Sequence, residues 1–370
     1  MIIGVIKEIK NNENRVGLTP DNVRDYVACG HKVLIETEAG MGVRFTDQDY
    51  IAAGATIMDT PGEVFNKSDM IIKVKELLPS EYHMLRSNTI LFTYLHLAAN
   101  EALARELMER NITAVAYETI EDKTGALPCL RPMSEIAGQL SIQEGAKYIE
   151  STYGGKGILL GGVPGVERGK VTIIGGGVTG TYAAKVALGL GANVTILDKN
   201  MARLEYLNDI FGNTITTLYS NNTNIEKCCR NADLIVGCVL TPGSRAPKII
   251  TEEHVKSMKH GSVIVDIAID QGGCCETSHV TTHDDPIFIK HGVVHYCVGN
   301  MPGSVPFTST IALTNVTEPY GLLIANNGIK KAIELEPGLK PGVNIYNGHC
   351  TNKNLAQSLN LEYKDLKKLL

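Results

Sequence analysis

Three glycines and one aspartate have the spacing of a dinucleotide-binding motif. Gly175, Gly177 and Gly180 fill the glycine positions of G-x-G-x-x-G, directly after the apolar run 171–174, and Asp198 ends the next apolar run. The first glycine permits a tight turn, the second lets backbone approach a pyrophosphate, and the third lets the helix pack closely on its strand. We expect the pyrophosphate at the N-terminus of the following helix, where unpaired N–H groups and the helix dipole favour an anion.

The acid at the end of the second strand indicates which dinucleotide binds. A carboxylate at Asp198 accepts hydrogen bonds from the adenosine ribose hydroxyls and repels a 2′-phosphate. The glycines alone are a weak signal, because 37 of the 370 residues are glycine. The preceding strand, the following helix and the acid together make the signal specific, so the sequence predicts NAD rather than NADP.

Two basic residues and a histidine follow strands in the N-terminal part of the chain. Arg15 comes after the apolar run 2–6, Lys75 closes 70–74 and His96 closes 90–95. A lone basic residue past a strand is usually a solvated charge, and a lone histidine is usually structural. Because parallel strands end at one edge of a sheet, where ligands bind, the three together favour a ligand site.

Polar residues also follow strands in the second half of the chain. The runs near 215–218, 234–239, 262–267 and 293–298 are followed by Ser220, Thr241, Asp270 and Asn300, which we expect to line the nicotinamide half of the site. Asp270 follows a strand that carries another acid, Asp266, and an acid here could instead hold a loop by accepting backbone N–H groups. Ser134, on a helix expected over 131–150, meets the cofactor or faces solvent.

Alternating strands and helices predict an α/β fold with parallel sheets. The chain of 370 residues is longer than one core usually serves, so about two domains are expected. Helices are expected near 80–86 and 100–110 and again over 309–327, and the tail is a short amphipathic segment.

Composition excludes several classes of protein. A hydrophobic content of 44%, a charged content of 20% and a net charge of −5 are typical of a soluble globular protein and give no reason to expect nucleic acid or membrane partners. The N-terminus has no signal peptide pattern, and no apolar run reaches the roughly 18 residues that span a bilayer, so we expect a cytoplasmic protein.

Nine scattered cysteines indicate reduced thiols rather than a disulfide framework. Cys274, Cys275, His279 and His283 lie close in sequence, but adjacent cysteines lack the usual C-x-x-C spacing of a metal chelate. We therefore expect no metal.

Several stretches, spread over nearly the whole chain, together resemble the alanine dehydrogenase family. They are KEIKNNENRVGLTP, IIKVKE, YLHLAAN, LRPMSEIAG, the glycine run ending in Asp198, SVIVDIAIDQGGCCETS and HYCVGNMPGSVP. The resemblance implies two doubly wound, Rossmann-like domains with the active site in the interdomain cleft. The substrate domain is then discontinuous, built from 1–130 and the C-terminal helices of 304–370, and the NAD-binding domain is 131–303. The resemblance also implies a homohexamer.

The activity implied by this resemblance is the reversible oxidative deamination of L-alanine to pyruvate and ammonium, with hydride transfer from Cα to the nicotinamide of NAD. Arg15 and Lys75 then bind substrate, and His96 and Asp270 handle protons. The cofactor contacts implied in this way are Ser134, Gly175, Gly177, Val178, Thr179, Gly180, Asp198, Arg203, Ser220, Val239, Leu240, Ile267, Asp270, Val298, Asn300 and Met301. His279 stands where the family is expected to have arginine, so a cofactor contact there is in doubt.

The chemistry of amino-acid oxidation needs these residue types. A planar guanidinium binds a carboxylate bidentately, and an ammonium supplies a compact charge near the carboxylate or the developing carbonyl. A base with a pKa near neutrality suits both deprotonation of the amine and attack of water, which favours His96 over Asp270.

Two alternatives remain open. The soluble subunit of proton-translocating transhydrogenase has a similar architecture but does not deaminate amino acids, and a nucleotide-sensing protein would keep the glycines and Asp198 without proton-handling residues. The set of Arg15, Lys75 and His96 argues against both.

Overall fold

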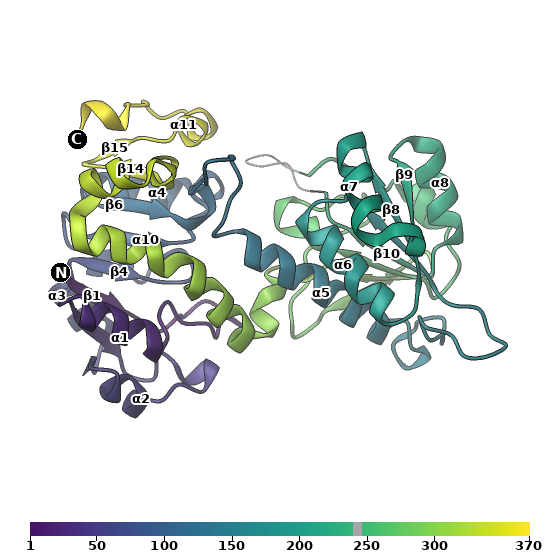
Figure 1. Cartoon of the computed structure of the whole chain (residues 1–370), viewed down its shortest axis with the longest axis horizontal. Helices are drawn as coiled ribbons and strands as arrows, with labels where there is room; N and C mark the ends of the chain where they lie inside the picture. Colours follow the sequence, from purple (N-terminus) through teal and green to yellow (C-terminus); the bar gives the residue numbers. More distant parts are fainter. Residues whose placement is uncertain (240–245) are drawn as a thin grey trace. The chain divides into compact units, whose positions relative to one another are not determined.

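The structure is a computed structural model that describes residues 1–239 and 246–370. The chain forms two compact units, of which unit 1 comprises Met1–Met133 and Val305–Leu370 and unit 2 comprises Ser134–Ser304. Each unit contains one mostly parallel sheet with helices against it (Figure 1), so the predicted α/β class with two doubly wound sheets is confirmed. The predicted position of the active site between the domains stays a prediction.

The described residues of unit 1 form an eight-stranded sheet in the order β15-β14-β6-β5-β4-β1-β2-β3. Its strands are β1 (Ile2–Val5), β2 (Lys32–Glu36), β3 (Thr56–Met58), β4 (Met70–Ile72), β5 (Ile90–Thr93), β6 (Thr113–Ala116), β14 (Val343–Tyr346) and β15 (His349–Cys350). β1 to β6 pair in parallel, and β14 and β15 are antiparallel. The parallel order reverses between β4 and β1, which is where such sheets bind ligands.

Most helices of unit 1 begin after a residue whose side chain caps them. They are α1 (Pro20–Ala28), α2 (Asp47–Ala52), α3 (Pro61–Lys67), α4 (Glu101–Glu109), α10 (Pro306–Leu335) and α11 (Lys353–Leu359). Thr19, Thr46 and Thr60 each accept the N–H of the third helical residue and so form capping boxes. The expected helix near 80–86 is only a 3₁₀ turn, Tyr82–Met84.

The C-terminal part of unit 1 is helical, as expected, but it also contributes two strands that the sequence reasoning missed. β14 and β15 flank Asn347 and Gly348, both at positive φ (48° and 75°), as a two-residue hairpin turn requires. The expected helix over 309–327 is the first part of α10, which lies across the sheet in Figure 1 and is interrupted at Gly328 (φ 71°). At Gly321 this helix approaches so closely that a Cβ would lie 2.1 Å from the Tyr26 hydroxyl of α1.

A buried ion triad lies at the carboxyl end of β1 and β4. Lys73, whose side chain is 1% exposed, contacts Glu8 at 3.2 Å and Glu81 at 3.0 Å, and both carboxylates are equally enclosed. Glu8 also accepts the N–H groups of Val74 (2.7 Å) and Lys75 (3.2 Å), and Glu81 accepts that of Leu78. Burial raises the pKa of Glu8, and the charge of Lys73 opposes that rise. The triad therefore ties the chain after β4 to the chain after β1.

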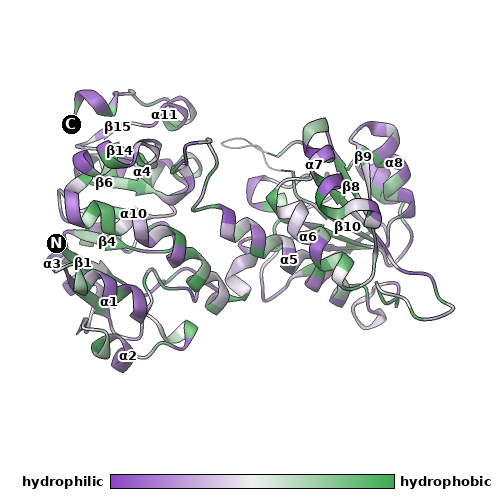
Figure 2. Cartoon of the chain, in the orientation of Figure 1, coloured by the Kyte–Doolittle hydropathy of each residue, from purple (hydrophilic) through white to green (hydrophobic). Residues whose placement is uncertain are grey.

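The described residues of unit 2 form a seven-stranded sheet in the order β12-β13-β11-β10-β7-β8-β9. Its strands are β7 (Lys170–Ile174), β8 (Asn193–Asp198), β9 (Ile215–Tyr219), β10 (Leu234–Gly237), β11 (Val263–Asp266), β12 (Ile287–Lys290) and β13 (Val293–Tyr296), and its helices are α5 (Arg131–Tyr148), α6 (Val178–Gly189), α7 (Met201–Phe211), α8 (Asn222–Asn231) and α9 (Glu252–Lys256). Only β12 is antiparallel to its neighbour within this described sheet. The inner strands are hydrophobic on both faces, as parallel strands covered by helices require (Figure 2).

A hydrogen-bonded chain of buried groups ends at His295 in β13. Cys275 Sγ lies 3.1 Å from Thr277 Oγ1, which lies 2.7 Å from His295 Nε2, while His295 Nδ1 lies 3.0 Å from the Val293 carbonyl. The carbonyl can only accept, so Nδ1 carries the proton and Nε2 accepts from Thr277. Burial lowers the pKa of His295 to about 4.

Removing the cation of the triad is expected to destabilise unit 1 severely. Lys73→Met leaves two buried carboxylates without their counter-ion, which typically costs about 3–5 kcal/mol. The loss should shrink between pH 8 and pH 5.5, since carboxyl groups protonate more readily once their cation is gone. Urea unfolding midpoints at the two pH values measure the effect, with the exposed Lys32→Met as the matched control. Equal midpoints for Lys73→Met and the control would contradict a stabilising triad.

The neutral state of His295 predicts a loss of stability in acid. Its pKa is about 4 in the folded protein and 6.5 in the unfolded chain, so between these values the unfolded chain binds the proton more tightly. The free energy of unfolding then falls by up to about 3 kcal/mol as pH drops from 6.5 to 4. His295→Gln, which keeps a polar group of similar reach but cannot titrate, should flatten this part of the stability curve. The exposed His83→Gln should leave it unchanged, and an equally steep curve for His295→Gln would refute the assignment.

Candidate active site

The predicted cofactor residues of unit 2 lie at the carboxyl ends of its parallel strands. Gly175 follows β7, Asp198 ends β8, Ser220 follows β9, Val239 follows β10, Ile267 and Asp270 follow β11, and Val298, Asn300 and Met301 follow β13. Because these strands are parallel, the residues share one edge of the sheet. Leu240 and Thr241, also expected here, lie outside the described residues. The parallel strands run in the order β9-β8-β7-β10-β11-β13, the 3-2-1-4-5-6 order of dinucleotide-binding sheets.

The glycine loop between β7 and α6 leaves room for an anion. Gly175 has φ 104°, and a Cβ on Gly180 would lie 2.0 Å from the Gly175 carbonyl oxygen, so neither position accepts a side chain. A Cβ on Gly177, in contrast, would meet no described atom within 4 Å. Gly177 is the N-cap of α6 and supplies no side-chain hydrogen bond, so the first N–H groups of the helix, at Val178 and Thr179, suit a pyrophosphate.

Asp198 and Arg203 hold this loop in place. Asp198 Oδ2 accepts the Gly176 N–H at 2.7 Å, and Oδ1 accepts the Asn200 N–H at 2.8 Å. Arg203 donates to the carbonyl oxygens of Gly176 and Gly177 and to Thr181 Oγ1. Each Asp198 oxygen has a second lone pair for a ribose hydroxyl. Arg203, expected only to contact the cofactor, has a structural role that the sequence reasoning missed.

Asp270 and Asn300 are neighbours across two strand ends. The Asn300 N–H lies 3.3 Å and 3.4 Å from the two Asp270 oxygens, and a Cβ on Gly299 would lie 3.0 Å from the nearer one. The loop-holding role considered for an acid here belongs mainly to Asp266. Its buried carboxylate accepts the N–H groups of Cys274 (3.1 Å) and Cys275 (3.0 Å).

Three other expected positions are enclosed. Ser220, Val298 and Met301 are buried, so any contact between them and a cofactor involves few side-chain atoms. Ser134 is partly buried on α5. His279, whose contact was in doubt, stacks on Phe288 with ring centroids 3.8 Å apart. This stacking gives His279 a packing role within unit 2.

Cys274 and Cys275 are likewise accounted for by contacts with Asp266 and Thr277. In the part of the chain that the structure describes, no three His, Cys, Asp or Glu side chains are grouped as metal ligands.

The predicted substrate residues of unit 1 follow adjacent strands of its sheet. Arg15 follows β1, Lys75 follows β4 and His96 follows β5, and β1 and β4 flank the point where the strand order reverses. Parallel pairing therefore places all three at one edge, as the sequence indicated.

Arg15 is 2% exposed and is paired with Glu13. Its Nε donates to Glu13 Oε1 at 2.7 Å, its Nη2 lies 2.5 Å from Oε2, and its Nη1 lies 3.1 Å from Met133 Sδ. Burial acts to raise the pKa of Glu13, but the hydrogen bonds and charge of Arg15 hold it below its ordinary value. Glu13, which the sequence reasoning missed, thus neutralises much of the charge of Arg15.

Lys75 is partly buried and is fixed through its backbone. Its N–H donates to Glu8 and its carbonyl accepts the Thr93 hydroxyl at 2.9 Å. Burial raises the pKa of Glu13 and Arg15 lowers it, and the positive charge of Lys75 adds to the lowering. Burial likewise raises the pKa of Glu76 and Lys10 lowers it, and Lys75 again adds to the lowering. The positive charge of Lys75 therefore reaches Glu13, the carboxylate that pairs with Arg15.

His96 has an exposed side chain and a left-handed backbone, with φ 48° and ψ 36°. Its N–H donates to Glu118 Oε1 at 2.7 Å, and its ring lies nearly parallel to that of Tyr94, with centroids 5.9 Å apart. The Tyr94 hydroxyl donates to the Cys129 carbonyl at 2.6 Å. Glu118 follows β6 at the same edge, so the rule that selected His96 could also have found it.

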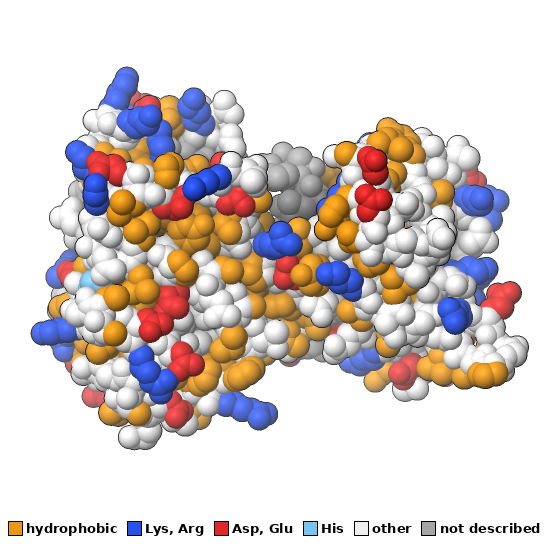
Figure 3. Space-filling view, in the orientation of Figure 1, with side chains coloured by type: hydrophobic (Ala, Val, Ile, Leu, Met, Phe, Trp, Pro, Cys, Tyr) orange, Lys and Arg blue, Asp and Glu red, His pale blue; other side chains and the backbone are white. Residues whose placement is uncertain are grey.

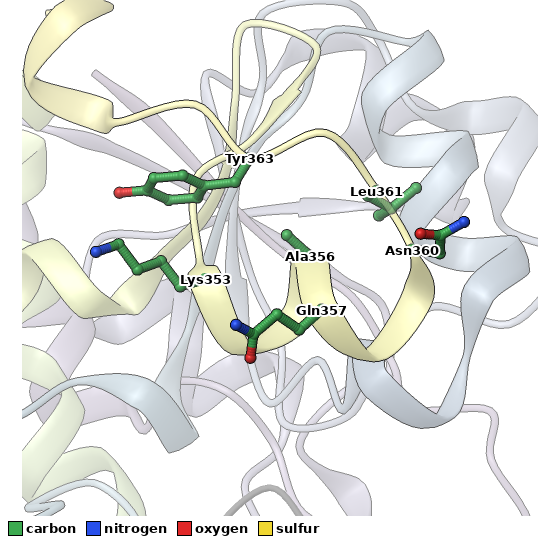
Figure 4. A pocket seen from close by; sticks show the side chains of 6 residues that line it. All are labelled: Lys353, Ala356, Gln357, Asn360, Leu361 and Tyr363. Atoms are coloured by element: carbon green, nitrogen blue, oxygen red, sulfur yellow. The ribbon is translucent and has the colours of Figure 1, made fainter.

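The surface shows other features that do not belong to this site. A pocket of about 360 Å³ beside α11 contains none of the predicted residues (Figure 4), and is lined by Lys353, Ala356, Gln357, Asn360, Leu361 and Tyr363. Basic and acidic side chains are interspersed on the face drawn in Figure 3. No helix among the described residues is long and apolar enough to cross a membrane.

Comparisons with known proteins agree across the whole chain. Models of the alanine dehydrogenase/PNT family match residues 4–137 (N-terminal domain) and 141–353 (C-terminal domain). An alanine dehydrogenase from Methanococcus maripaludis is 57% identical and alanine dehydrogenase 2 from Staphylococcus aureus is 54% identical, each over 100% of both chains.

Solved structures agree with this. An L-alanine dehydrogenase is 51% identical with a TM-score of 0.94, covering 97% of this chain and 99% of that one. A transhydrogenase from Sinorhizobium meliloti shares the fold, with a TM-score of 0.82 at 22% identity, covering 95% of this chain and 99% of that one. The chain belongs to the alanine dehydrogenase family.

Proposed function

We propose that the protein catalyses the reversible oxidative deamination of L-alanine to pyruvate and ammonium with NAD. The observation that carries the proposal is the placement of Arg15, Lys75 and His96 at one edge of the unit 1 sheet, beside the reversal of its strand order. That set supplies two cations for a carboxylate and one imidazole that can take up and return a proton. Full-length identity of 57% to an alanine dehydrogenase supports the same substrate.

We assign cofactor binding to residues 131–303 and substrate binding to 1–130 with 304–370. Family membership supports a nicotinamide cofactor, and Asp198 at the end of β8 supports NAD. The loop from Gly175 to Gly180 with the N-terminus of α6 would hold the pyrophosphate. When bound, NAD supplies the acceptor for the hydride that leaves Cα. The remaining contacts are proposed at Ser134, Arg203, Ser220, Val239, Leu240, Ile267, Asp270, Val298, Asn300 and Met301.

Arg15 and Lys75 bind the substrate carboxylate and the developing carbonyl. The Nε and Nη2 groups of Arg15 donate to Glu13, and this contact fixes the plane of the guanidinium. Lys75 supplies a compact positive charge from the neighbouring strand end.

His96 moves the protons. It takes one from the substrate amine before hydride transfer and one from the water that attacks the imine, and it returns them in the reverse reaction. Asp270, held by the Asn300 N–H, orients that water. The amine must be neutral, so deamination should favour higher pH than reductive amination.

We further propose that the enzyme is a cytoplasmic homohexamer without nucleic-acid or membrane partners. Family membership supports the assembly. So does the segment 154–169, which precedes β7 and on which Leu159, Val163 and Val166 are 69%, 53% and 63% exposed. Apolar side chains presented together in this way suit contact between subunits.

The activity is tested by NADH formation at 340 nm across a panel of amino acids. L-Alanine should be oxidised, and His96→Asn should lower turnover by roughly 100- to 10,000-fold, the usual contribution of a placed acid or base. His83→Asn, at an exposed position of the same unit, should be fully active. Absence of NADH formation with every amino acid would refute the proposed function. Full activity of His96→Asn would leave the function but move proton transfer to Asp270.

Asp198→Ala is expected to relax the choice of nucleotide. Each hydrogen bond lost to a charged acceptor costs about 1.5–3 kcal/mol, so NADH should bind much more weakly. The variant also loses the support of Gly176 and Asn200, and that damage should weaken NADH and NADPH equally. The ratio of the two affinities, measured by nicotinamide fluorescence, therefore isolates the ribose contact. The exposed Asp209→Ala should keep the original ratio, and an unmodified protein that uses both nucleotides equally would contradict the prediction.

A further inference from the structure

Glu118 binds the backbone that carries His96. This residue belongs to the short 3₁₀ turn η4 (Tyr117–Thr119) after β6, and β6 pairs with β5, whose carboxyl end leads to His96. Glu118 Oε1 accepts the His96 N–H at 2.7 Å and the Leu95 N–H at 3.1 Å, and Oε2 lies 3.2 Å from the Leu95 N–H. One carboxylate thus holds two consecutive peptide groups.

Those two hydrogen bonds stabilise an uncommon backbone conformation. His96 is in the left-handed region, where the Cβ of a non-glycine residue comes too close to the following carbonyl oxygen. Hydrogen bonds to a charged acceptor are stronger than those between neutral groups, and the two bonds to Glu118 offset that cost. Without them the chain after β5 is free to extend, and in extended backbone successive side chains point to opposite faces. The direction of the His96 side chain therefore depends on Glu118.

The Tyr94 ring lies against the His96 imidazole and limits its rotation. The two rings are nearly parallel, with an angle of 11° between them. Burial raises the pKa of Tyr94 well above its ordinary value, so its hydroxyl remains a donor to the Cys129 carbonyl and the ring is fixed. Backbone and ring together confine His96 although its side chain is exposed.

We propose that Glu118 is a positioning residue for His96, which sets the direction of the imidazole for proton transfer and does not itself act on the substrate. The inference rests on the proposed function, because it assigns Glu118 a role in that reaction through His96. Its chemistry is that of an acceptor for backbone N–H groups rather than of an acid or base.

A double-mutant cycle tests this inference. A misplacement of about 1 Å costs about 100-fold, so Glu118→Ala should lower the kcat of L-alanine deamination by about 10- to 100-fold. The KM for alanine and the dissociation constant of NADH should stay within about twofold, since Arg15, Lys75 and the nucleotide site of unit 2 are untouched. In the His96→Ala background, Glu118→Ala should reduce kcat no further than about twofold, because residues that act as one unit are not additive.

Conservative variants separate positioning from charge. Glu118→Gln keeps a carbonyl oxygen that can accept both N–H groups and should retain kcat within about fivefold. Glu118→Asp keeps the charge but is shorter by one methylene, and should lose kcat at least about tenfold. This pair also serves if Glu118→Ala does not fold. Glu121→Ala, an exposed carboxylate three residues further along, should match the unmodified enzyme.

The possible results distinguish the two proposals. Equal further loss of kcat in the His96→Ala background, or a Glu118→Gln variant as weak as Glu118→Ala, would show that Glu118 acts by its own charge and would overturn the inference. Full activity of Glu118→Ala would also overturn it. Full activity of His96→Ala would instead refute the proton assignment on which the inference rests.

Discussion

Parallel strand pairing is the constraint on which the arrangement of functional residues depends. In both units six parallel strands follow the order 3-2-1-4-5-6, so these six strands end at the same edge of their sheet. Arg15, Lys75, His96 and Glu118 reach one edge in unit 1 from four different loops, and the glycine loop, Asp198, Asp270 and Asn300 do so in unit 2. Pairing places these strand ends side by side, and the loops hold the residues that follow them.

Carboxylates hold these loops by accepting hydrogen bonds from backbone N–H groups, and this interaction occurs at four strand ends. Glu8 accepts the N–H groups of Val74 and Lys75, Glu118 those of Leu95 and His96, Asp198 that of Gly176, and Asp266 those of Cys274 and Cys275. Each acid follows or ends one strand; Glu8, Glu118 and Asp198 bind the loop after a neighbouring strand, and Asp266 binds the loop after its own strand. A charged acceptor makes stronger hydrogen bonds than a neutral one, which suits loops whose backbone groups no longer have a strand partner.

The sequence predicts the residues that follow strands, because apolar runs identify the strands. This was sufficient for Arg15, Lys75, His96, Asp198 and Asp270. It did not identify what those residues contact. Glu13, Glu81 and Glu118 are ordinary acids in the sequence, and their partners are set by tertiary packing. The charge of a residue alone does not tell whether the side chain pairs inside the protein or contacts a ligand. Lys73 pairs with two buried carboxylates, whereas Lys75, two positions later, is proposed to bind substrate.

Local signals were also overridden or overlooked at particular elements. Near 80–86 a helical pattern gave way to a short turn, because Glu81 points inward to Lys73 and its carboxylate accepts the Leu78 N–H. Asn347 and Gly348 are a typical sequence signal for the turn of the β14–β15 hairpin. The helical pattern before them led to a prediction of helices in this part of the chain, so the hairpin was missed. The family resemblance implied a cofactor contact for Arg203, and only the folded chain shows that it donates to the glycine loop.

The pairing of Arg15 with Glu13 has a consequence for the proposed reaction. A buried arginine whose charge is balanced by a carboxylate still offers directional N–H donors, but it contributes little net potential. Against the effect of burial, the hydrogen bonds and charge of Arg15 lower the pKa of Glu13, and the charge of Lys75 adds to that lowering. In the proposed reaction a positive charge beside the substrate disfavours a second cation, and so it favours loss of the proton from the substrate ammonium group. Hydride transfer requires that neutral amine. In the proposed reaction Lys75 therefore has two roles, binding of the carboxylate and making the amine easier for His96 to deprotonate.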